Sequence, residues 1–372
     1  MIKPLTLDRL SLLDVRNLAS VELEPAPHIN VIAGNNGQGK TSVLEAIYAL
    51  ATSRSFRTTT TRELVRHSTP MARIRGRLAE HWPTGKLNRD QGIDLSARGK
   101  RELVLDSEPP VSLTHYATRS PVVVFEPKQL ALTTGPAAER RTLLDRVTLF
   151  THPEVGVHRA RYAMALKERL ILLADRHRDR SAELSAYETL LAEHGAQLTS
   201  IRALAVAALL EPLKEAFHRI AAPNLNLDVR YVPGGSADAG EMLARLAHDR
   251  RADQQRKRTG YGPHRDDLEL TLDGHEARVV ASQGQHRALT LALKIAEHRA
   301  IASARGVQPI LLLDDVSSEL DADRTAALFD HLATTESQIF LTTTRRDWIL
   351  VSGATRDRAD FIVEGGIVTP AR

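Results

Sequence analysis

The run GNNGQGKT, residues 34–41, constrains the fold of this 372-residue chain more than any other feature of the sequence. It fits the pattern G-x-x-x-x-G-K-[ST], follows the apolar stretch His28–Ala33 and precedes the apolar-periodic stretch Val43–Leu50. This order predicts a strand, a glycine-rich turn and a helix, because the glycines let backbone amides and the helix N-terminus close around phosphate groups. The chain should therefore have α/β character around a phosphate-binding loop.

Each residue type in this loop has an expected task. The backbone cradles the β and γ phosphates of a nucleotide, Lys40 adds a positive charge, and the Thr41 hydroxyl can bind Mg²⁺. An incidental glycine-rich turn is the alternative, and the matching flanks on both sides weigh against it. The expected nucleotide-binding residues are Gly34, Asn35, Asn36, Gly37, Gln38, Gly39, Lys40 and Thr41.

Two consecutive acids follow a second apolar run. Residues Pro309–Leu313 are typical of a central parallel strand, which would deliver Asp314 and Asp315 to the carboxyl edge of a sheet. Asp314 is the expected Mg²⁺ ligand, and Asp315 is placed to orient or deprotonate the attacking water. Two acids after a strand can instead cap a helix, an alternative that weakens once the phosphate loop is accepted.

Residues 281–285, Ala-Ser-Gln-Gly-Gln, precede a helix expected from about His286 to Ala300. They resemble the signature loop of ABC-type ATPases, L-S-G-G-Q, with Ala for Leu and Gln for the first Gly. In that family the serine and the amides after it complete the nucleotide site of the opposite subunit, so the resemblance implies ATP-driven dimerisation. A serine that caps a helix is the plainer meaning of such a run. The residues concerned are Ser282, Gln283, Gly284 and Gln285.

Three further segments occupy places where ABC-type ATPases carry motifs. The run SSELD after Asp315 resembles their D-loop, which implies that Asp321 lies near the phosphates of a partner subunit. The expected strand at residues 338–341 ends in three threonines, where transporters carry a switch histidine; Thr343 or Thr344 would have to contact the γ-phosphate instead. Gln129 lies roughly where a glutamine loop is expected, and a surface glutamine is equally consistent with the sequence.

The spacing of the motifs predicts two domains. Lys40 and Asp314 lie nearly 275 residues apart, and a long helical pattern fills much of that space. We expect an α/β head at residues 1–150 and 260–372, with a small antiparallel sheet at residues 73–104, and a helical lobe at residues 151–259. We expect the lobe to be a helical hairpin packed on itself, and a coiled-coil arm used for partner contact is the alternative. Its apolar repeat consists of Leu184, Tyr187, Leu191, Leu198, Ile201, Ala205 and Ala208, with His194 at the missing position.

Composition narrows the class of protein. With 42% hydrophobic and 26% charged residues the chain is ordinary for a globular protein, and the absence of cysteine excludes disulfides and cysteine-bound metals. Asp8 and Asp14 interrupt any signal-like start, and the apolar runs fall short of the ~20 residues that span a bilayer. We therefore expect a cytoplasmic protein without a membrane partner.

The net charge of +4 is mild, so a nucleic-acid site would have to come from local clusters of cations. Such clusters could neutralise phosphates in a salt-dependent way, although a solvated helix face is an equally good explanation. Only 4% of residues are aromatic, so contact with the duplex backbone is more plausible than base stacking. The candidate DNA-binding residues are Arg250, Arg251, Arg256, Lys257 and Arg258, with a second strip of Arg54, Arg57 and Arg62.

Taken together, the motifs resemble one family. A head split by an insert is the pattern of the structural-maintenance-of-chromosomes ATPases, whose inserts are usually much longer. The segments GNNGQGKT, YGPHRDDL, SQGQHR and LLLDDVSSELD, with LTTT after them, resemble the RecF family of bacterial DNA replication and repair ATPases. The resemblance covers essentially the whole chain.

This resemblance implies a fold and an activity. The fold would be an ABC-type P-loop ATPase head with mixed sheets, split by an α-helical lobe. The activity would be ATP-dependent dimerisation on duplex and gapped or junction DNA, with Mg²⁺ and slow ATP hydrolysis, in DNA recombination and repair. Partners would be RecO and RecR in loading RecA, with a link to the SOS response and a place at the bacterial nucleoid. Asp315, in place of the usual glutamate, has a shorter reach, which fits slow turnover.

Other functions compete with this one. An ABC-type ATPase that drives a transporter or another machine is the main alternative, and the split head argues against the transporter version. A small-molecule kinase would suit the phosphate loop but leaves the SQGQ run without a task. A GTPase lacks an N-K-x-D motif here, and an inactive scaffold is disfavoured by intact Lys40, Thr41 and Asp314.

Overall fold

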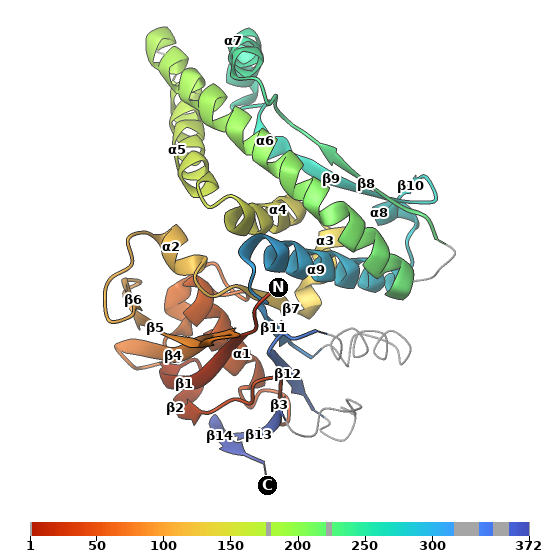
Figure 1. Ribbon diagram of the computed structural model, residues 1–372. Coiled ribbons are helices and arrows are strands. Elements are labelled where there is room, and N and C mark those ends of the chain that lie inside the picture. The colour runs from red at the N-terminus through yellow and green to blue at the C-terminus, as the bar shows by residue number, and fades with distance from the viewer. Residues whose placement is uncertain (1, 176–179, 221–224, 316–334, 345–356, 372) are drawn as a thin grey trace. The chain divides into compact units, whose positions relative to one another are not determined.

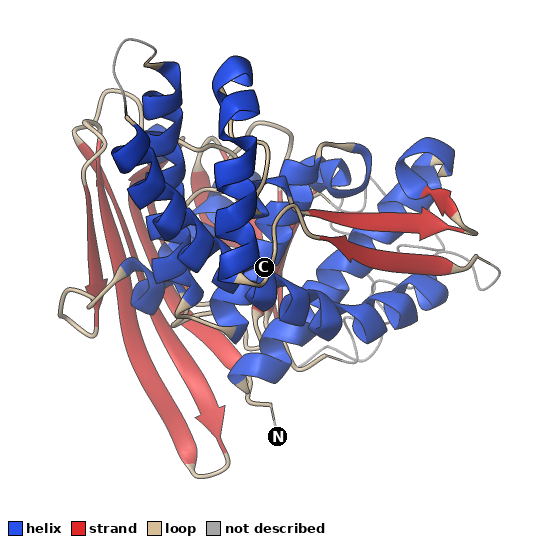
Figure 2. Ribbon diagram, turned by 90° about the horizontal axis from the view of Figure 1, so that it is seen from above, coloured by secondary structure: helices blue, strands red, loops and turns tan. Residues whose placement is uncertain are grey.

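A computed structural model describes residues 2–175, 180–220, 225–315, 335–344 and 357–371 (Figures 1 and 2). Contacts divide the chain into two units, Met1–Gln129 with Ala216–Ala222 and Arg287–Arg372, and Leu130–Glu215 with Pro223–His286. These boundaries differ from the expected ones at residues 150 and 260, because α4 (Ala137–Thr151) packs against β9 (Asp267–Leu272) in the second unit. Asp321 lies outside the described residues.

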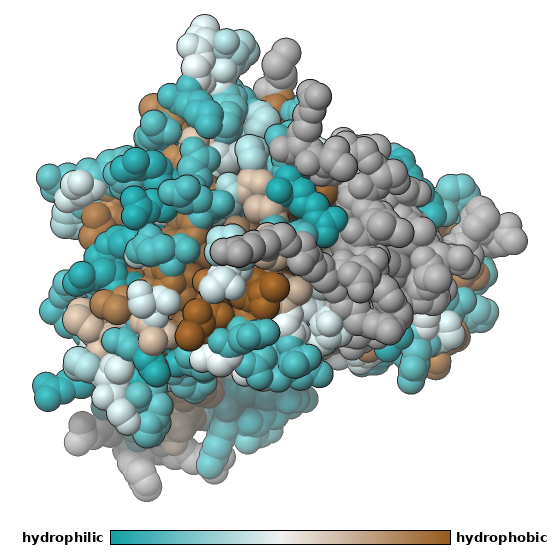
Figure 3. Space-filling model, turned by 90° about the horizontal axis from the view of Figure 1, so that it is seen from below, coloured by the Kyte–Doolittle hydropathy of each residue, from teal (hydrophilic) through white to brown (hydrophobic). Residues whose placement is uncertain are grey.

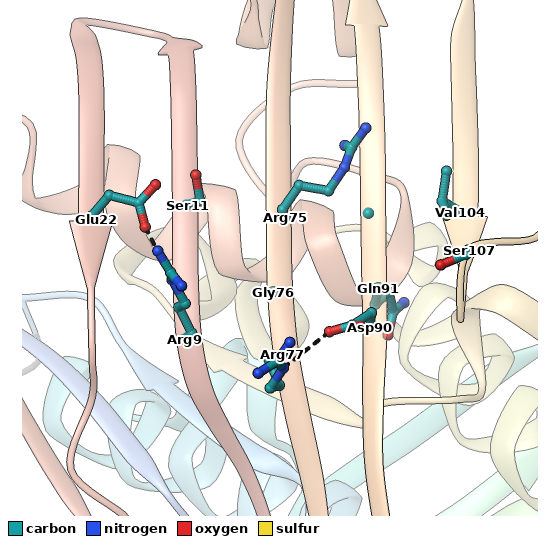
Figure 4. Close-up of a pocket in the computed structure, with 11 residues that line it drawn as sticks. Arg9, Ser11, Glu22, Arg75, Gly76, Arg77, Asp90, Gln91, Val104 and Ser107 are labelled. Atoms are coloured by element: carbon teal, nitrogen blue, oxygen red, sulfur yellow. Dashed lines mark hydrogen bonds and ion pairs between the residues drawn. The ribbon is translucent and has the colours of Figure 1, made fainter.

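The first unit contains an antiparallel sheet, red to orange in Figure 1, in the order β2-β1-β4-β5-β6. Its alternating pattern buries one face against the core and leaves the other polar. On the polar face Arg9 pairs with Glu22 and Arg77 with Asp90 (Figure 4). The sheet expected at residues 73–104 is thereby confirmed. Its strands are β1 (Leu5–Val15), β2 (Leu18–Leu23), β4 (Met71–Trp82), β5 (Gly85–Ser96) and β6 (Arg101–Leu105).

The second sheet of this unit is mostly parallel, in the order β14-β13-β3-β12-β11-β7, with β14 antiparallel at one edge. It is fully buried in its centre, as its continuous apolar runs predict. The carboxyl ends of β3, β12 and β11 meet at one edge. The strands are β3 (Ile29–Ala33), β7 (Val122–Phe125), β11 (Ile310–Leu313), β12 (Ile339–Thr343), β13 (Arg358–Glu364) and β14 (Ile367–Pro370).

Helix α1 (Lys40–Thr52) lies between the two sheets and contacts strands of both. Almost every one of its side chains is buried, which explains why its sequence is apolar nearly all round. It approaches β4 closely at Gly76, where a Cβ atom would lie 2.3 Å from the Leu50 Cδ2. The mixed sheets around this helix confirm the expected α/β class.

One side chain joins the two sheets. Gln338, 1% exposed at the start of β12, accepts a hydrogen bond from the Leu7 amide at 2.6 Å and donates to the Leu7 carbonyl at 3.2 Å. It also donates to the Ala26 carbonyl at 2.8 Å. Leu7 lies where the register of β1 against β4 shifts, so its backbone groups take this amide as partner.

The second unit combines helices with a small sheet in the order β10-β9-β8. The expected helical hairpin is confirmed as α5 and α6, and α7 packs on it as a third helix. Gly195 on α6 makes this possible, because a Cβ atom there would lie 2.6 Å from the Met242 sulfur. The elements are α5 (Val155–Ala174), α6 (Ser181–Ile220), α7 (Ala239–Arg256), β8 (Leu227–Val232), β10 (His275–Glu276) and α8 (Ala277–Val280).

Buried ion pairs fix the packing of these helices. Arg169 on α5 is fully buried and bonds Glu188 of α6 at 3.1 Å and Asp253 of α7 at 2.7 Å. The run YGPHRDD has a similar structural task, because the buried Asp266 accepts bonds from Arg202 and from the Tyr231 hydroxyl. Charges this deep are stable only when they are paired.

Of the remaining described helices, only α9 (Gln283–Arg305) is long. The signature-like segment leads into α9, which confirms the helix expected after residue 285. The others are α2 (Leu113–Ala117), α3 (Ala131–Thr134) and the 3₁₀ turns at Thr61–Leu64, Pro127–Leu130 and Pro263–Arg265.

Hydropathy singles out α6 among the described helices. By length and composition it could cross a membrane, since an 18-residue window reaches a mean hydropathy of 1.2. Half of that window is buried inside the protein, as in the core helix of a soluble protein, so the signal is weak. One face of the molecule shows hydrophobic side chains among hydrophilic ones (Figure 3), which is ordinary for a folded protein.

We expect Gln338→Leu to lower the free energy of unfolding by about 2–4 kcal/mol, because it leaves the buried backbone groups of Leu7 and Ala26 without this partner. Urea unfolding of variant and wild type measures the change. Gln255→Leu, on the exposed side of α7, is the control and should shift stability by no more than about 0.5 kcal/mol. Equal effects of the two substitutions would contradict the bridging role.

Candidate nucleotide-binding site

The loop between β3 and α1 has the backbone that its glycines predict. Gly37 and Gly39 have φ values of 80° and 121°, and a Cβ atom on Gly34 would lie 2.4 Å from the Val363 carbonyl oxygen. Asn17 fixes the loop to the helix, since its side chain donates to the Gln38 carbonyl at 2.9 Å and accepts from the Ser42 hydroxyl at 2.9 Å. The strand, turn and helix order is confirmed.

Lys40 curls back over this loop. Its ammonium donates to the carbonyl oxygens of Gly34 at 2.7 Å and Asn35 at 3.0 Å, and the residue is only 7% exposed. Burial lowers the pKa of Lys40, while Asp315 and Asp314 oppose that shift. A bound phosphate would add negative charge beside the ammonium and so favour its protonated form.

Thr41 and Asp314 meet at the carboxyl edge of the parallel sheet. The Thr41 hydroxyl donates to the Asp314 Oδ1 at 2.9 Å. Neighbouring ligands of an octahedral Mg²⁺, bound at 2.0–2.1 Å, have about this separation, so the two oxygens fit that ion. Among the described residues, no group of three or more His, Cys, Asp or Glu side chains could by itself hold a metal ion. The site therefore suits a cation that completes its shell with phosphate and water oxygens.

Thr342 orients both acids, and the sequence did not single it out. Its hydroxyl donates to the Asp314 Oδ1 at 2.8 Å and accepts from the Asp315 amide at 2.9 Å. Burial raises the pKa of Asp314, and the hydrogen bonds from Thr342 and Thr41 partly offset this. Asp315 adopts the left-handed region at φ 49°. Thr343 and Thr344, the two threonines that the sequence offered for this contact, do not line the cavity described below, and Thr344 is exposed.

A cavity of about 640 Å³ lies over these groups. Arg57 is part of its wall rather than of a separate strip, and it bonds the buried Glu45 at 3.2 Å. Glu45 also accepts two hydrogen bonds from Arg16, at 2.7 and 2.9 Å. This one carboxylate therefore holds both Arg16 and Arg57 at the wall of the cavity. The lining includes Arg16, Asn17, Asn36, Gly37, Gly39, Lys40, Thr41, Ser42, Arg57, Glu63, His67, Asp314, Asp315 and Thr342.

The signature-like residues form a capping box at the start of α9, in the second unit. The Gln285 amide donates to the Ser282 hydroxyl at 3.2 Å, and the Ser282 amide donates to the Gln285 Oε1 at 2.7 Å. The plainer interpretation, a helix cap, is therefore correct. It does not exclude the other, because a hydroxyl that accepts a bond still has a hydrogen to donate. Ser282 and Gln283 are exposed.

The candidate DNA-binding cations differ in their surroundings. Arg250 bonds the buried Glu188, which makes it a counter-ion of the helical unit. Pairing with a buried glutamate thus accounts for both Arg57 and Arg250 without DNA. The candidates that are exposed are Arg54, Arg57, Arg62, Arg251, Arg256, Lys257 and Arg258.

Glu126 is a further group near the site that the sequence did not indicate. It follows β7 directly, and Asp314 is held beside it because the Asp314 amide donates to the Phe125 carbonyl at 2.8 Å. Burial raises the pKa of Glu126 to about 7; Lys128 opposes the shift and Asp314 adds to it. Gln129 lies one turn further on, and its side-chain oxygen is buried without a partner among the described residues. Its role as a glutamine loop stays a prediction.

Comparison with known families and proteins gives consistent results. The chain matches the family model described as RecF/RecN/SMC N terminal domain over residues 6–357. It is 40% identical over 371 residues to the DNA replication and repair protein RecF of Anaeromyxobacter sp. (strain Fw109-5), covering 97% of this chain and 98% of that protein. RecF of Myxococcus xanthus (strain DK1622) is 38% identical, covering 95% and 94%.

Solved structures agree with the sequence relatives. The recombination mediator protein RecF with ATPrS, in the RecFOR pathway, has a TM-score of 0.88 and 26% identity, covering 100% of this chain and 99% of that one. An Smc head domain from Pyrococcus furiosus, bound to the C-terminal domain of ScpA, has a TM-score of 0.56 and 14% identity, covering 99% and 96%. The similarity to the Smc head domain shows a shared fold alone.

We expect the pH dependence of stability to change in Glu126→Gln. A carboxyl whose pKa rises from 4.5 to about 7 on folding holds its proton in the folded state, so stability falls as pH rises through that window. Removing the carboxyl should stabilise the variant relative to wild type progressively from pH 5 to pH 8, by at most about 3 kcal/mol. Urea unfolding without nucleotide or metal measures this.

The control for that experiment is Glu108→Gln, which changes an exposed glutamate of the same unit. Parallel pH profiles for wild type and Glu126→Gln would show that the Glu126 carboxyl does not take up a proton on folding.

Proposed function

The chain belongs to the RecF family of DNA replication and repair proteins, and from that premise we propose that it is an ATP-switched DNA-binding protein of recombinational gap repair. The observation that carries the proposal is the Thr41–Asp314 pair at the phosphate loop, with Lys40 beside it. The solved relative described with ATP in the RecFOR pathway supports ATP as the nucleotide.

In the proposed binding mode each residue of the site has a task. The loop amides hold the phosphates, and Lys40 moves its ammonium from the loop carbonyls of Gly34 and Asn35 towards them. Thr41 and Asp314 would hold Mg²⁺, which neutralises phosphate charge when bound. Asp315 would orient the attacking water, and Thr342 holds its backbone amide. The short Asp315 side chain, on a backbone fixed in the left-handed region, supports slow turnover.

The nucleotide is proposed to pair two copies of the chain. The exposed Ser282 hydroxyl and the start of α9 would bind the phosphates held by the phosphate loop of the partner, since a helix N-terminus with a hydroxyl donor favours anions. ATP binding would thus close the dimer, and hydrolysis would release it.

DNA is the proposed second ligand. Cations that are exposed and not held by a buried acid are the better candidates for phosphate contact, so we favour Arg62, Arg251 and Arg256 over Arg57 and Arg250. Duplex and gapped or junction DNA are the expected targets. By family membership, the expected partners are RecO and RecR, with RecA loading at gaps as the outcome, in the bacterial cytoplasm at the nucleoid.

We expect the wild type to dimerise and to retain duplex DNA only with ATP and Mg²⁺, and to retain less of it at higher salt. Lys40→Met should abolish ATP-dependent dimerisation, because the phosphate charge is left unpaired. Ser282→Arg should bind ATP as a monomer yet fail to pair, because the signature residues act on the opposite subunit. Sedimentation with and without ATP, at two salt concentrations, measures all three.

The matched control is Ser112→Arg, since Ser112 caps α2 in the same way that Ser282 caps α9. It should pair normally. The proposed function would be contradicted if the wild type stays monomeric with ATP and does not bind duplex DNA.

A further inference from the structure

We propose that Arg140 is a positioning residue that holds the signature loop, residues 281–285, in its place from both ends. The proposal rests on the proposed function, because it concerns the loop that would contact the nucleotide of the partner. Arg140 lies on α4, far from the loop in sequence, and is only 7% exposed. Its three guanidinium nitrogens donate hydrogen bonds to two groups of acceptors, backbone carbonyls at α3 and the carboxylate at the start of β9.

The first direction is the short helix α3. One Arg140 nitrogen, Nη1, donates to the Leu132 carbonyl at 3.2 Å and to the Gly135 carbonyl at 3.1 Å. The turn needs glycine, because a Cβ atom on Gly135 would lie 2.6 Å from the Ala131 carbonyl oxygen. Arg140 therefore fixes the residues on both sides of Thr133.

Thr133 in turn contacts the segment that follows the signature loop. Its hydroxyl lies 3.1 Å from the His286 Nδ1, and both residues are buried, at 2% and 6% exposed. His286 belongs to the first turn of α9, and its amide donates to the Ser282 carbonyl at 2.9 Å. A buried hydrogen bond of this kind is costly to leave unmade, so it fixes the end of the loop.

The second direction is strand β9. The Arg140 Nε and Nη2 bond the two carboxylate oxygens of Asp267 at 2.7 and 3.0 Å, a bidentate pair. Burial alone would raise the pKa of Asp267, but the hydrogen bonds from Arg140 hold it below its ordinary value, so the pair is ionised. Asp267 begins β9, and α8 packs against both β9 and α3.

Helix α8 leads directly into the signature loop, since it ends at Val280 and Ser282 caps the next helix. Arg140 thus supports the start of the loop through β9 and α8, and the end of the loop through α3 and His286. Lysine keeps the charge but presents a single ammonium, which cannot reach Asp267 and both α3 carbonyls in this planar arrangement.

The test compares Arg140→Lys with wild type in the full chain. Hydrogen exchange of the amides at residues 281–286, without nucleotide, should become about tenfold faster in the variant. ATP affinity of the monomer should stay within about twofold, because the phosphate loop lies in the other unit, while ATP-dependent dimerisation should weaken by about tenfold. Unchanged exchange at residues 281–286 would overturn the proposal.

Two further variants keep the result decisive. Arg230→Lys changes an exposed arginine of β8 that pairs with Glu269 on β9, the strand that Asp267 begins, and should leave exchange and dimerisation as in wild type. Thr133→Val replaces the hydroxyl with a methyl group, which removes its contacts with His286 and with the Leu130 carbonyl, and it tests this route even if Arg140→Lys does not fold; it too should speed exchange. If wild type fails to dimerise with ATP, the proposed function fails, and the exchange result still decides the role of Arg140.

Discussion

The hydrogen bond between Thr41 and Asp314 is the contact on which the nucleotide site depends. It joins the first turn of α1 to the end of β11, although the two residues lie nearly 275 positions apart. They meet because β3, β12 and β11 are parallel neighbours whose carboxyl ends share one edge. Behind that edge, Gln338 joins the two sheets and Gly76 lets α1 lie close against β4.

The sequence predicted the parts whose chemistry depends on local order. A phosphate loop between a strand and a helix, and acids that end an apolar strand, need no knowledge of distant contacts. The choice among Thr342, Thr343 and Thr344 does require knowledge of distant contacts. A strand buried on both faces shows no alternation of apolar and polar residues, so the sequence does not tell which side chain faces the site. Only the register of β12 against its neighbours places Thr342 on Asp314.

The same limit applies to the arginines. In the sequence, Arg57 and Arg250 look like members of basic strips, but each neutralises a carboxylate that the fold buries, Glu45 and Glu188. No sequence signal indicated the positioning role of Arg140, because its carboxylate partner, Asp267, lies 127 residues further along the chain. A buried acid requires a cation wherever the fold places it, so a cluster of positive charge predicts DNA contact only where no such acid is near.

The account's central claim is that the phosphate loop of one copy and the signature loop of another form one site. Mixing Lys40→Met with Ser282→Arg tests it most directly, because a mixed dimer has one site in which Lys40 and Ser282 are both intact. ATP hydrolysis by the mixture should exceed the mean of the two variants measured separately. A rate equal to that mean, across protein concentrations at which wild type pairs, would contradict the claim.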